Sequence, residues 1–131
     1  MSVTTAMTTS FKQELLQGLH DLDGHTLKLA LIKSGESGTY NETSTNYSDI
    51  TGNSDEASGT GYSSGGATLG SVAITTSGTT AFVDFADVSF SNSTISASGA
   101  MIYNSSASNR AIAVISFGGT VASTAGTFTV A

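Results

Sequence analysis

The sequence predicts a mainly β fold, an antiparallel β-sandwich of the jelly-roll or Greek-key kind that carries one short N-terminal α-helix. Two observations support this prediction. From residue 65 onward, short apolar runs rich in Val, Ile, Phe and Tyr alternate with segments of Ser, Asn and Gly, as in antiparallel strands joined by turns. Only one stretch, near the N-terminus, has the spacing of an amphipathic helix.

The composition favours a small β-rich structural domain. A chain of 131 residues corresponds to one domain, which we expect to span residues 10–131. Charged residues make up 11% of the chain, against about 25% in an average protein. The absence of Cys excludes disulfides and thiolate metal sites. A small domain without disulfides gains stability by other means, and oligomerisation is a common one.

Charge and hydropathy exclude several classes of partner. The chain has four Lys and Arg against ten Asp and Glu, a net charge of −6 that speaks against a nucleic-acid partner. No apolar run approaches the roughly 20 residues of a membrane-spanning helix, so no membrane partner is expected. The first residues do not resemble a signal peptide, and we therefore expect a soluble protein made in a cytoplasm.

Residues 1–9 are polar and β-branched, and we expect them to form an N-terminal arm. One interpretation is a frayed terminus. The other is an extended arm that pairs with a neighbouring subunit. In that case its candidate contact residues are Val3, Thr4, Thr5 and Met7.

A helix is predicted within residues 10–22. Ser10 and Gln13 match a capping box, in which each side chain bonds the backbone amide of the other residue. Gly24 is a natural stop. The apolar side chains that recur every three or four residues are Phe11, Leu15, Leu19 and Leu22. We expect about ten helical residues, and we expect this stripe to pack on the core rather than bind a partner.

The next segments are a strand and a long loop. Alternating residues from Thr26 to Ile32 predict a half-buried strand. Residues 33–64 are expected to form a long exposed loop region with one short strand around residues 47–50, because structureless connections of this length are uncommon. Tyr40, Tyr47 and Tyr62 lie there among Gly, Asn and Ser, as in adaptable binding surfaces, and such tyrosines can hold a glycan by stacking.

The second half of the chain predicts an antiparallel meander. Residues 65–76 form a strand interrupted by Gly70, and Ser77-Gly78 starts a hairpin. Residues 79–90 are apolar on both faces, so either both faces are covered or a bulge near residues 84–87 resets the register. A tight turn is expected at Asn92-Ser93, a polar connection at 104–110, and a last strand at 127–131.

No arrangement of residues points to catalysis, a cofactor or a metal. Residues 21–24 begin like a calcium loop but lack the glutamate that such a loop requires. Asp84 and Asp87 would need a bulge to share a cation, and solvated carboxylates are the simpler interpretation. His20 and His25 are the only imidazoles, and no nucleophile elbow or phosphate loop accompanies them. We therefore expect a protein that is not an enzyme.

Six phrases of the chain, taken in order, resemble a known family. They are SFKQELLQGLH (10–20), LKLALI (27–32), SGTGYSSGGATL (58–69), TTAFVDFADVSF (79–90), SGAMIYN (98–104) and AIAVISFGG (111–119). Their order is similar to that in a family of small virion structural proteins of tailed bacteriophages. The chain departs from it at Ser98 and Ser116, where the family has an Arg and an Asp. The family has no catalytic residues to transfer.

The resemblance implies a role in a virus particle. The leading hypothesis is a head decoration (cement) protein that binds the major capsid protein on the outside of an assembled phage head, as a homotrimer at the virion surface. One alternative is a receptor- or glycan-binding module of a tail or head fibre, with residues 33–64 as the contact surface. Another is a neck or connector component.

Overall fold

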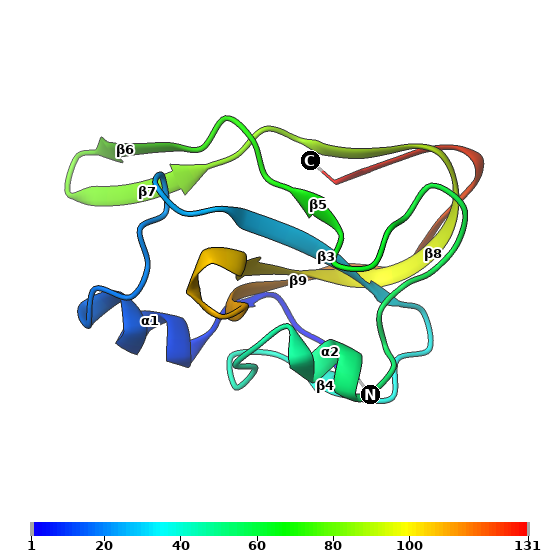
Figure 1. Cartoon of the computed structure of the whole chain (residues 1–131), viewed down its shortest axis with the longest axis horizontal. Coiled ribbons are helices and arrows are strands. Elements are labelled where there is room, and N and C mark those ends of the chain that lie inside the picture. Colours follow the sequence, from blue (N-terminus) through cyan, green and yellow to red (C-terminus); the bar gives the residue numbers. More distant parts are fainter. Residues whose placement is uncertain (1, 131) are drawn as a thin grey trace.

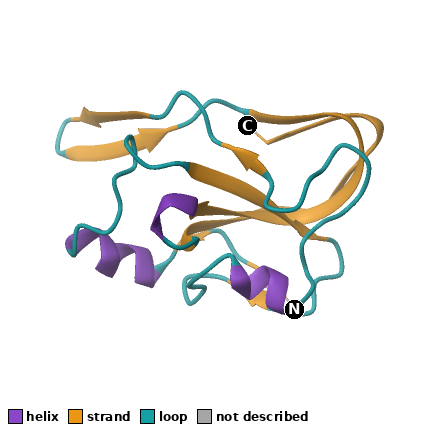
Figure 2. Ribbon diagram, viewed as in Figure 1, coloured by secondary structure: helices purple, strands orange, loops and turns teal. Residues whose placement is uncertain are grey.

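The computed structural model describes residues 2–130 and is mainly β, with antiparallel sheets and a short N-terminal helix, as predicted (Figures 1 and 2). The helical segments are α1 (Thr9–Leu16), α2 (Ser48–Gly52) and the 3-10 turn η1 (Ser105–Ala107). The strands are β1 (Ser2–Val3), β2 (Ala6–Met7), β3 (Leu27–Lys33), β4 (Thr39–Tyr40), β5 (Ala67–Thr68), β6 (Ala73–Ser77), β7 (Thr80–Asp84), β8 (Val88–Asn104) and β9 (Arg110–Val130). None of the helices in the described part of the chain has the length and hydropathy needed to span a bilayer.

One five-stranded sheet organises the molecule. Its strand order is β2-β9-β8-β3-β5, and all neighbours in it are antiparallel. Two separate two-stranded sheets accompany it, the antiparallel β6–β7 ribbon and the parallel pair β1–β4. The predicted sandwich of two stacked sheets is not confirmed by this topology.

The two longest strands, β8 and β9, form a single bent hairpin. They curve at the right of Figure 1, so that their far ends return across β3. The pairing register shifts at several points along β8, and Asn92 has a φ of +50° there. Such bulges bend and twist a strand. The turn predicted at Asn92-Ser93 is therefore wrong, because the chain passes this point as a bulge within one strand. The polar connection predicted at 104–110 is confirmed as the turn around η1.

The core lies on both faces of the sheet. One face of β3 carries Leu27, Leu29 and Leu31, which pack against residues of the bent hairpin such as Phe90 and Phe128. On the other face, a second cluster forms from Ala30, Ile32, Tyr40, Ile50, Met101, Tyr103, Ala111 and Val114. The strand predicted as half-buried is thus covered on both sides, as a central strand is.

The N-cap of helix α1 lies two residues before the predicted one. Thr8, not Ser10, is the N-cap, and its Oγ1 accepts a hydrogen bond from the Phe11 amide at 3.2 Å. Thr8 also donates to the backbone carbonyls of Ala111 and Ile112, which ties the cap to β9. The helix ends at Leu16, because the chain reverses at Gly18 with a φ of +74°. The predicted extent of 10–22 is therefore too long.

The N-terminal arm belongs to its own subunit. Strand β1 pairs with β4, and β2 pairs with β9 at Val114 and Ala113. The Thr4 amide donates to the Tyr40 carbonyl at 2.9 Å, so the backbone of the arm is already partnered within the chain. The prediction of a frayed terminus is wrong for residues 2–7, because they pair within the chain. Contact of the arm with a neighbouring subunit stays a prediction. Met1 lies outside the described residues.

The region 33–64 is folded rather than an exposed loop. The strand predicted around residues 47–50 is wrong, since this stretch enters helix α2. Asp49 accepts the Thr45 amide at 2.8 Å, and Asn46 accepts the Ser48 amide at 3.0 Å, so polar side chains start a helical turn there. Ile50 is fully buried in the core. The region packs its interior against the main sheet.

Candidate functional site

An apolar groove of about 720 Å³ opens between helix α1 and the β6–β7 ribbon. In Figure 1 these two elements lie at the left, on opposite sides of the start of β3. The residues that line it are Met7, Phe11, Leu15, His20, Asp21, Leu22, Ile74, Ala81, Phe82, Val83, Phe85, Ile102, Ile112 and Ala113. Large apolar side chains that remain exposed to this extent often mark an interaction surface.

One wall of the groove is the β6–β7 ribbon. The predicted hairpin at Ser77-Gly78 is confirmed, with Gly78 at a φ of +60° in the turn. All of β6 is exposed, and Val83 alone in β7 is half-buried. Ile74 and Phe82 keep 49% and 46% of their surface exposed. An isolated two-stranded ribbon is marginally stable in water, so a covering partner would stabilise this one.

The other wall is helix α1, which a polar network holds against the β8–β9 turn. Glu14 accepts a hydrogen bond from His20 Nε2 at 3.0 Å and pairs with Arg110 Nε at 3.4 Å. The amide nitrogen of Asn104 donates to Nδ1 of His20 and to Nδ1 of His25, at 3.0 Å each. This network positions helix α1. The Nδ1 atoms of His20 and His25 already accept hydrogen bonds from Asn104.

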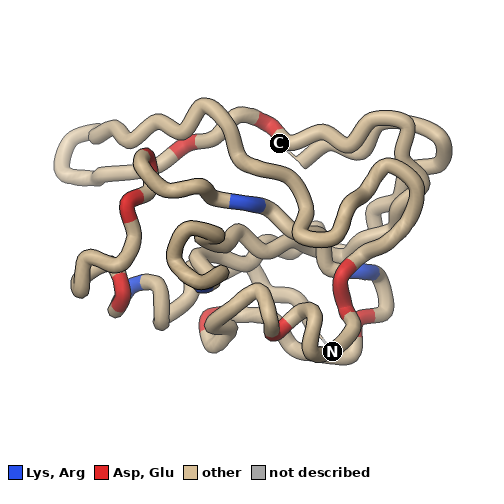
Figure 3. Tube along the Cα trace, viewed as in Figure 1, with Lys and Arg blue, Asp and Glu red and all other residues tan. Residues whose placement is uncertain are grey.

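Four aspartates lie in or beside segments that line the groove, and none of them has an ion-pair partner among residues 2–130. Asp21 lines it, and Asp23 follows in the same connection. Asp84 ends β7, and Asp87 follows before β8. Figure 3 shows acidic segments along the connection after α1 and along the end of the ribbon. Among residues 2–130, the ion pairs involve Glu14 and Asp55 and none of these four aspartates.

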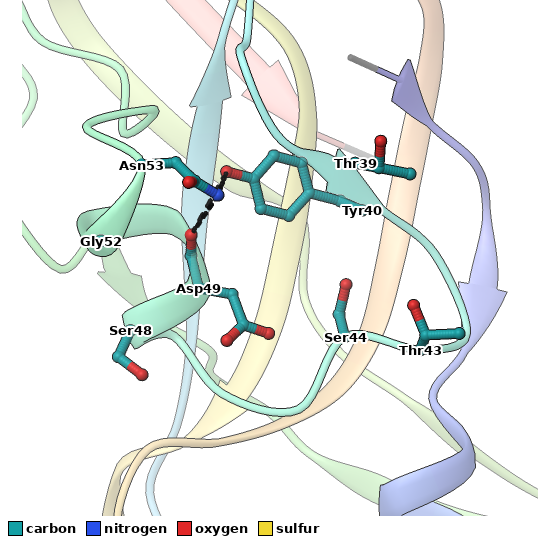
Figure 4. A pocket seen from close by; sticks show the side chains of 8 residues that line it. All are labelled: Thr39, Tyr40, Thr43, Ser44, Ser48, Asp49, Gly52 and Asn53. Atoms are coloured by element: carbon teal, nitrogen blue, oxygen red, sulfur yellow. Dashed lines mark hydrogen bonds between the residues drawn. The ribbon is translucent and has the colours of Figure 1, made fainter.

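A second hollow of about 390 Å³ is polar and lies on the 33–64 region (Figure 4). The residues that line it are Thr39, Tyr40, Thr43, Ser44, Ser48, Asp49, Gly52 and Asn53. In Figure 4 the amide of Asn53 bridges the Tyr40 hydroxyl and the Asp49 carbonyl, at 3.3 Å and 3.0 Å. Several hydroxyls and one carboxylate thus surround a shallow opening.

Buried Asp55 organises the floor beneath this hollow. It is 0% exposed and accepts hydrogen bonds from the Tyr40 hydroxyl at 2.5 Å, the Ser37 amide at 2.9 Å and the Gly38 amide at 2.8 Å. Burial alone would raise the pKa of Asp55, but these hydrogen bonds together lower it. Lys33 Nζ lies 3.8 Å from the same carboxylate. The arrangement is a satisfied structural anion rather than a reactive one.

A second carboxylate, Glu56, joins two of the predicted contact tyrosines. Tyr47 donates to one of its oxygens at 2.5 Å and Tyr62 to the other at 2.6 Å. Burial, followed by these bonds to Glu56, raises the pKa of both tyrosines. Tyr47 also stacks on Tyr103, with ring centroids 4.6 Å apart. Burial raises the pKa of Tyr103 to about 12.

The structure places most of the predicted contact residues in the interior or its border. Tyr40 is 1% exposed, and Tyr47 and Tyr62 are half-buried with their hydroxyls committed to Glu56. Val3 packs against the same cluster as Tyr40 and Tyr47. The idea that the three tyrosines present open stacking faces is therefore wrong for Tyr40, and it is weakened for the other two.

The remaining predicted contact residues lie near β9. Thr5 accepts the Ser116 amide at 2.9 Å, and Thr4 is exposed beside β4. Met7 is 50% exposed and lines the apolar groove. Met7 is thus the one residue of the predicted set that belongs to this groove.

Comparison with known proteins gives no relative. No family model, curated protein or solved structure matches this chain. Within the described range, no group of three His, Asp or Glu side chains is arranged to hold a metal ion.

Sequence reasoning missed the groove residues on α1 and the ribbon. Leu15 and Leu19 are 46% and 36% exposed, although their stripe predicted core packing. Phe11 alone of the residues within α1 is buried. One signal was present in the sequence: residues 79–90 are apolar on both faces, which indicated either cover on both sides or a bulge near residues 84–87. In the structure β7 ends at Asp84 and β8 begins at Val88, and most of the ribbon stays exposed.

Proposed function

We propose that the chain is a structural protein of a bacteriophage virion, a head decoration (cement) protein that binds the major capsid protein on the outer surface of the assembled head. The observation that carries the proposal is the open apolar groove between α1 and the β6–β7 ribbon. Exposure of this apolar surface to water is unfavourable in free energy for a monomer. A partner that covers the surface makes its burial favourable. The six phrases that resemble small virion proteins supply the context.

The composition agrees with this role. A net charge of −6 with 11% charged residues suits a protein that works beside a protein shell rather than on nucleic acid. Binding that favours the assembled shell over its separated subunits shifts the disassembly equilibrium toward the shell. The role requires no catalysis, cofactor or metal.

A homotrimer is part of the proposal, because the local three-fold positions of a capsid match a three-fold oligomer. The bent β8–β9 hairpin and the core on both faces of the main sheet would form the rigid scaffold of such a subunit.

The number of copies per purified particle tests the function. A decoration protein occurs in hundreds of copies, so a quantitative gel against the major capsid protein should give a comparable band. A dozen copies or fewer would place the protein in the neck, connector or tail and would overturn the proposal.

A second candidate function is receptor or glycan binding by a fibre module, and the polar hollow of Figure 4 favours it. Hydroxyls of Thr43, Ser44 and Ser48 and the Asp49 carboxylate surround that opening. Sugars are recognised by such hydrogen-bonding groups. A glycan array with the wild-type protein and with Ser48→Ala/Asp49→Asn separates the two functions, since only a glycan-binding module loses array signal in the variant.

A further inference from the structure

We propose that the groove between α1 and the β6–β7 ribbon binds a cationic amphipathic segment of the shell protein, with bulky apolar side chains that enter the groove and Lys or Arg that meet the surrounding aspartates. The inference rests on the proposed function for the identity of the partner. Its chemistry rests on two separate features of the groove, the apolar lining and the acidic rim.

The lining defines the apolar part of the occupant. Phe11, Ile102 and Ile112 form a buried floor, with exposed fractions of 2%, 8% and 6%. Leu15 and Phe82 form walls that are each 46% exposed. The floor is buried and the walls are about half-exposed. Such a groove can accept apolar side chains that enter from its open side, as in helix-in-groove recognition.

The open walls argue for a macromolecular segment rather than a small molecule. A typical small-ligand pocket buries about 70–90% of its ligand. Here the ribbon side chains Ile74 and Phe82 remain about half-exposed, so a small apolar molecule would stay partly in water. The polypeptide of a partner protein covers the open side with its own backbone and neighbouring side chains.

The rim defines the charge of the occupant. Asp21 lines the groove, and Asp23 follows it two residues later; Asp84 lies between Val83 and Phe85, which both line the groove, and Asp87 follows before β8. Asp21 and Asp84 accept the backbone amides of Gly24 and Phe85, and none of the four aspartates has an ion-pair partner among residues 2–130. An apolar segment flanked by Lys or Arg supplies those missing cations.

The same rim argues against a second copy of this chain as the occupant. A symmetric contact would bring two acidic rims together, and like charges side by side are unfavourable. Arg110 and Lys33 are already paired with Glu14 and Asp55, so only Lys12 and Lys28 are left without an ion pair among residues 2–130, against four aspartates per copy. Lys12 is the single cation on α1.

Peptide binding to the full-length protein tests the inference. The probe is a fluorescent amphipathic peptide of Leu and Lys about four helical turns long, and its matched counterpart carries Glu in place of every Lys. We expect saturable one-to-one binding of the Lys peptide that weakens as salt rises, and at least about tenfold weaker binding of the Glu peptide. Equal binding of the two peptides would overturn the inference.

Matched variants locate the binding. Phe82→Ser should weaken Lys-peptide binding by about tenfold or more, whereas Val121→Ser, also exposed but outside the groove, should not. Asp84→Asn should weaken it more than Glu42→Gln, which removes the same charge elsewhere. If Phe82→Ser leaves affinity unchanged, or if the two charge variants behave alike, the groove is not the site.

Two further readouts separate the inference from the function it rests on. If Leu15→Ser/Phe82→Ser turns an oligomer into a monomer in analytical ultracentrifugation, the occupant is a second copy and the inference fails. If the Lys peptide binds the groove but purified particles lack the protein, the proposed function fails while the chemistry of the groove stands.

Discussion

Leu15 of α1 and Phe82 of β7 line opposite walls of one apolar groove, and each keeps 46% of its surface exposed. The helix is held in place by the Glu14–His20–Asn104 network, and the ribbon projects with little burial of its own. A surface built from two such elements is suited to be completed by another molecule. We propose that the completing molecule is a capsid shell.

The double variant Leu15→Ser/Phe82→Ser should lose attachment to particles while its own fold survives. Because both side chains are half-exposed, each change should cost no more than about 1 kcal/mol of unfolding free energy. Copy number on particles and the thermal midpoint measure the two effects, with Val121→Ser as the control. A variant that unfolds as readily as it detaches would speak against a docking role.

The lowered pKa of Asp55 means that the protein should lose stability in acid. Because its folded-state pKa is lowered below the ordinary 3.8, its stabilising effect is present above that value and is lost as pH falls through the folded pKa. Asp55→Asn should cost about 1–3 kcal/mol at neutral pH, and its unfolding free energy should fall less steeply below pH 4. Urea titrations across pH measure both. An unchanged slope in the variant would contradict the assignment.

The raised pKa values of the tyrosines mean that the protein should lose stability in alkali. Burial, followed in most of them by bonds to carboxylates, raises the pKa of Tyr40, Tyr47, Tyr62 and Tyr103 above the ordinary 10.0. A raised folded-state pKa means that stability is full below pH 10 and is lost as pH rises through the folded values. Tyrosinate absorbance should appear together with unfolding. A fraction of the signal titrating near pH 10 in the folded protein would contradict this.

Thr8 predicts that the N-terminal segment is structural. Its hydroxyl caps α1 and contacts the carbonyls of Ala111 and Ile112, so Thr8→Ala should cost about 1–2 kcal/mol, or about 3–8 °C in thermal midpoint. Thr9→Ala, an exposed neighbour, is the control. If Thr8→Ala has the same thermal midpoint as the wild type, the N-terminal segment is a loosely attached arm and this prediction is wrong.

Much of the fold follows from local pattern. The hairpin at Ser77-Gly78 and the polar turn at 104–110 were predictable, because turn residues separate apolar runs there. The continuous strand through Asn92 was not. A single residue with positive φ makes either a turn or a bulge, and the distant pairing with β9 decides between them.

The candidate site was harder to predict than the fold. The helix cap at Thr8 depends on carbonyls of β9, and the buried tyrosines depend on Asp55 and Glu56, so long-range contacts decide both. The stripe of α1 predicts an apolar face but not what faces it. The ribbon lies opposite that face because of how the whole chain folds. The spacing of apolar residues within one segment does not predict this arrangement.

A cryo-EM map of native virions tests the proposed docking on the capsid most directly. We expect density for this subunit on the outer surface of the capsid, around the local three-fold positions, with the α1–ribbon groove turned toward the shell. A complete capsid map without such density would contradict it.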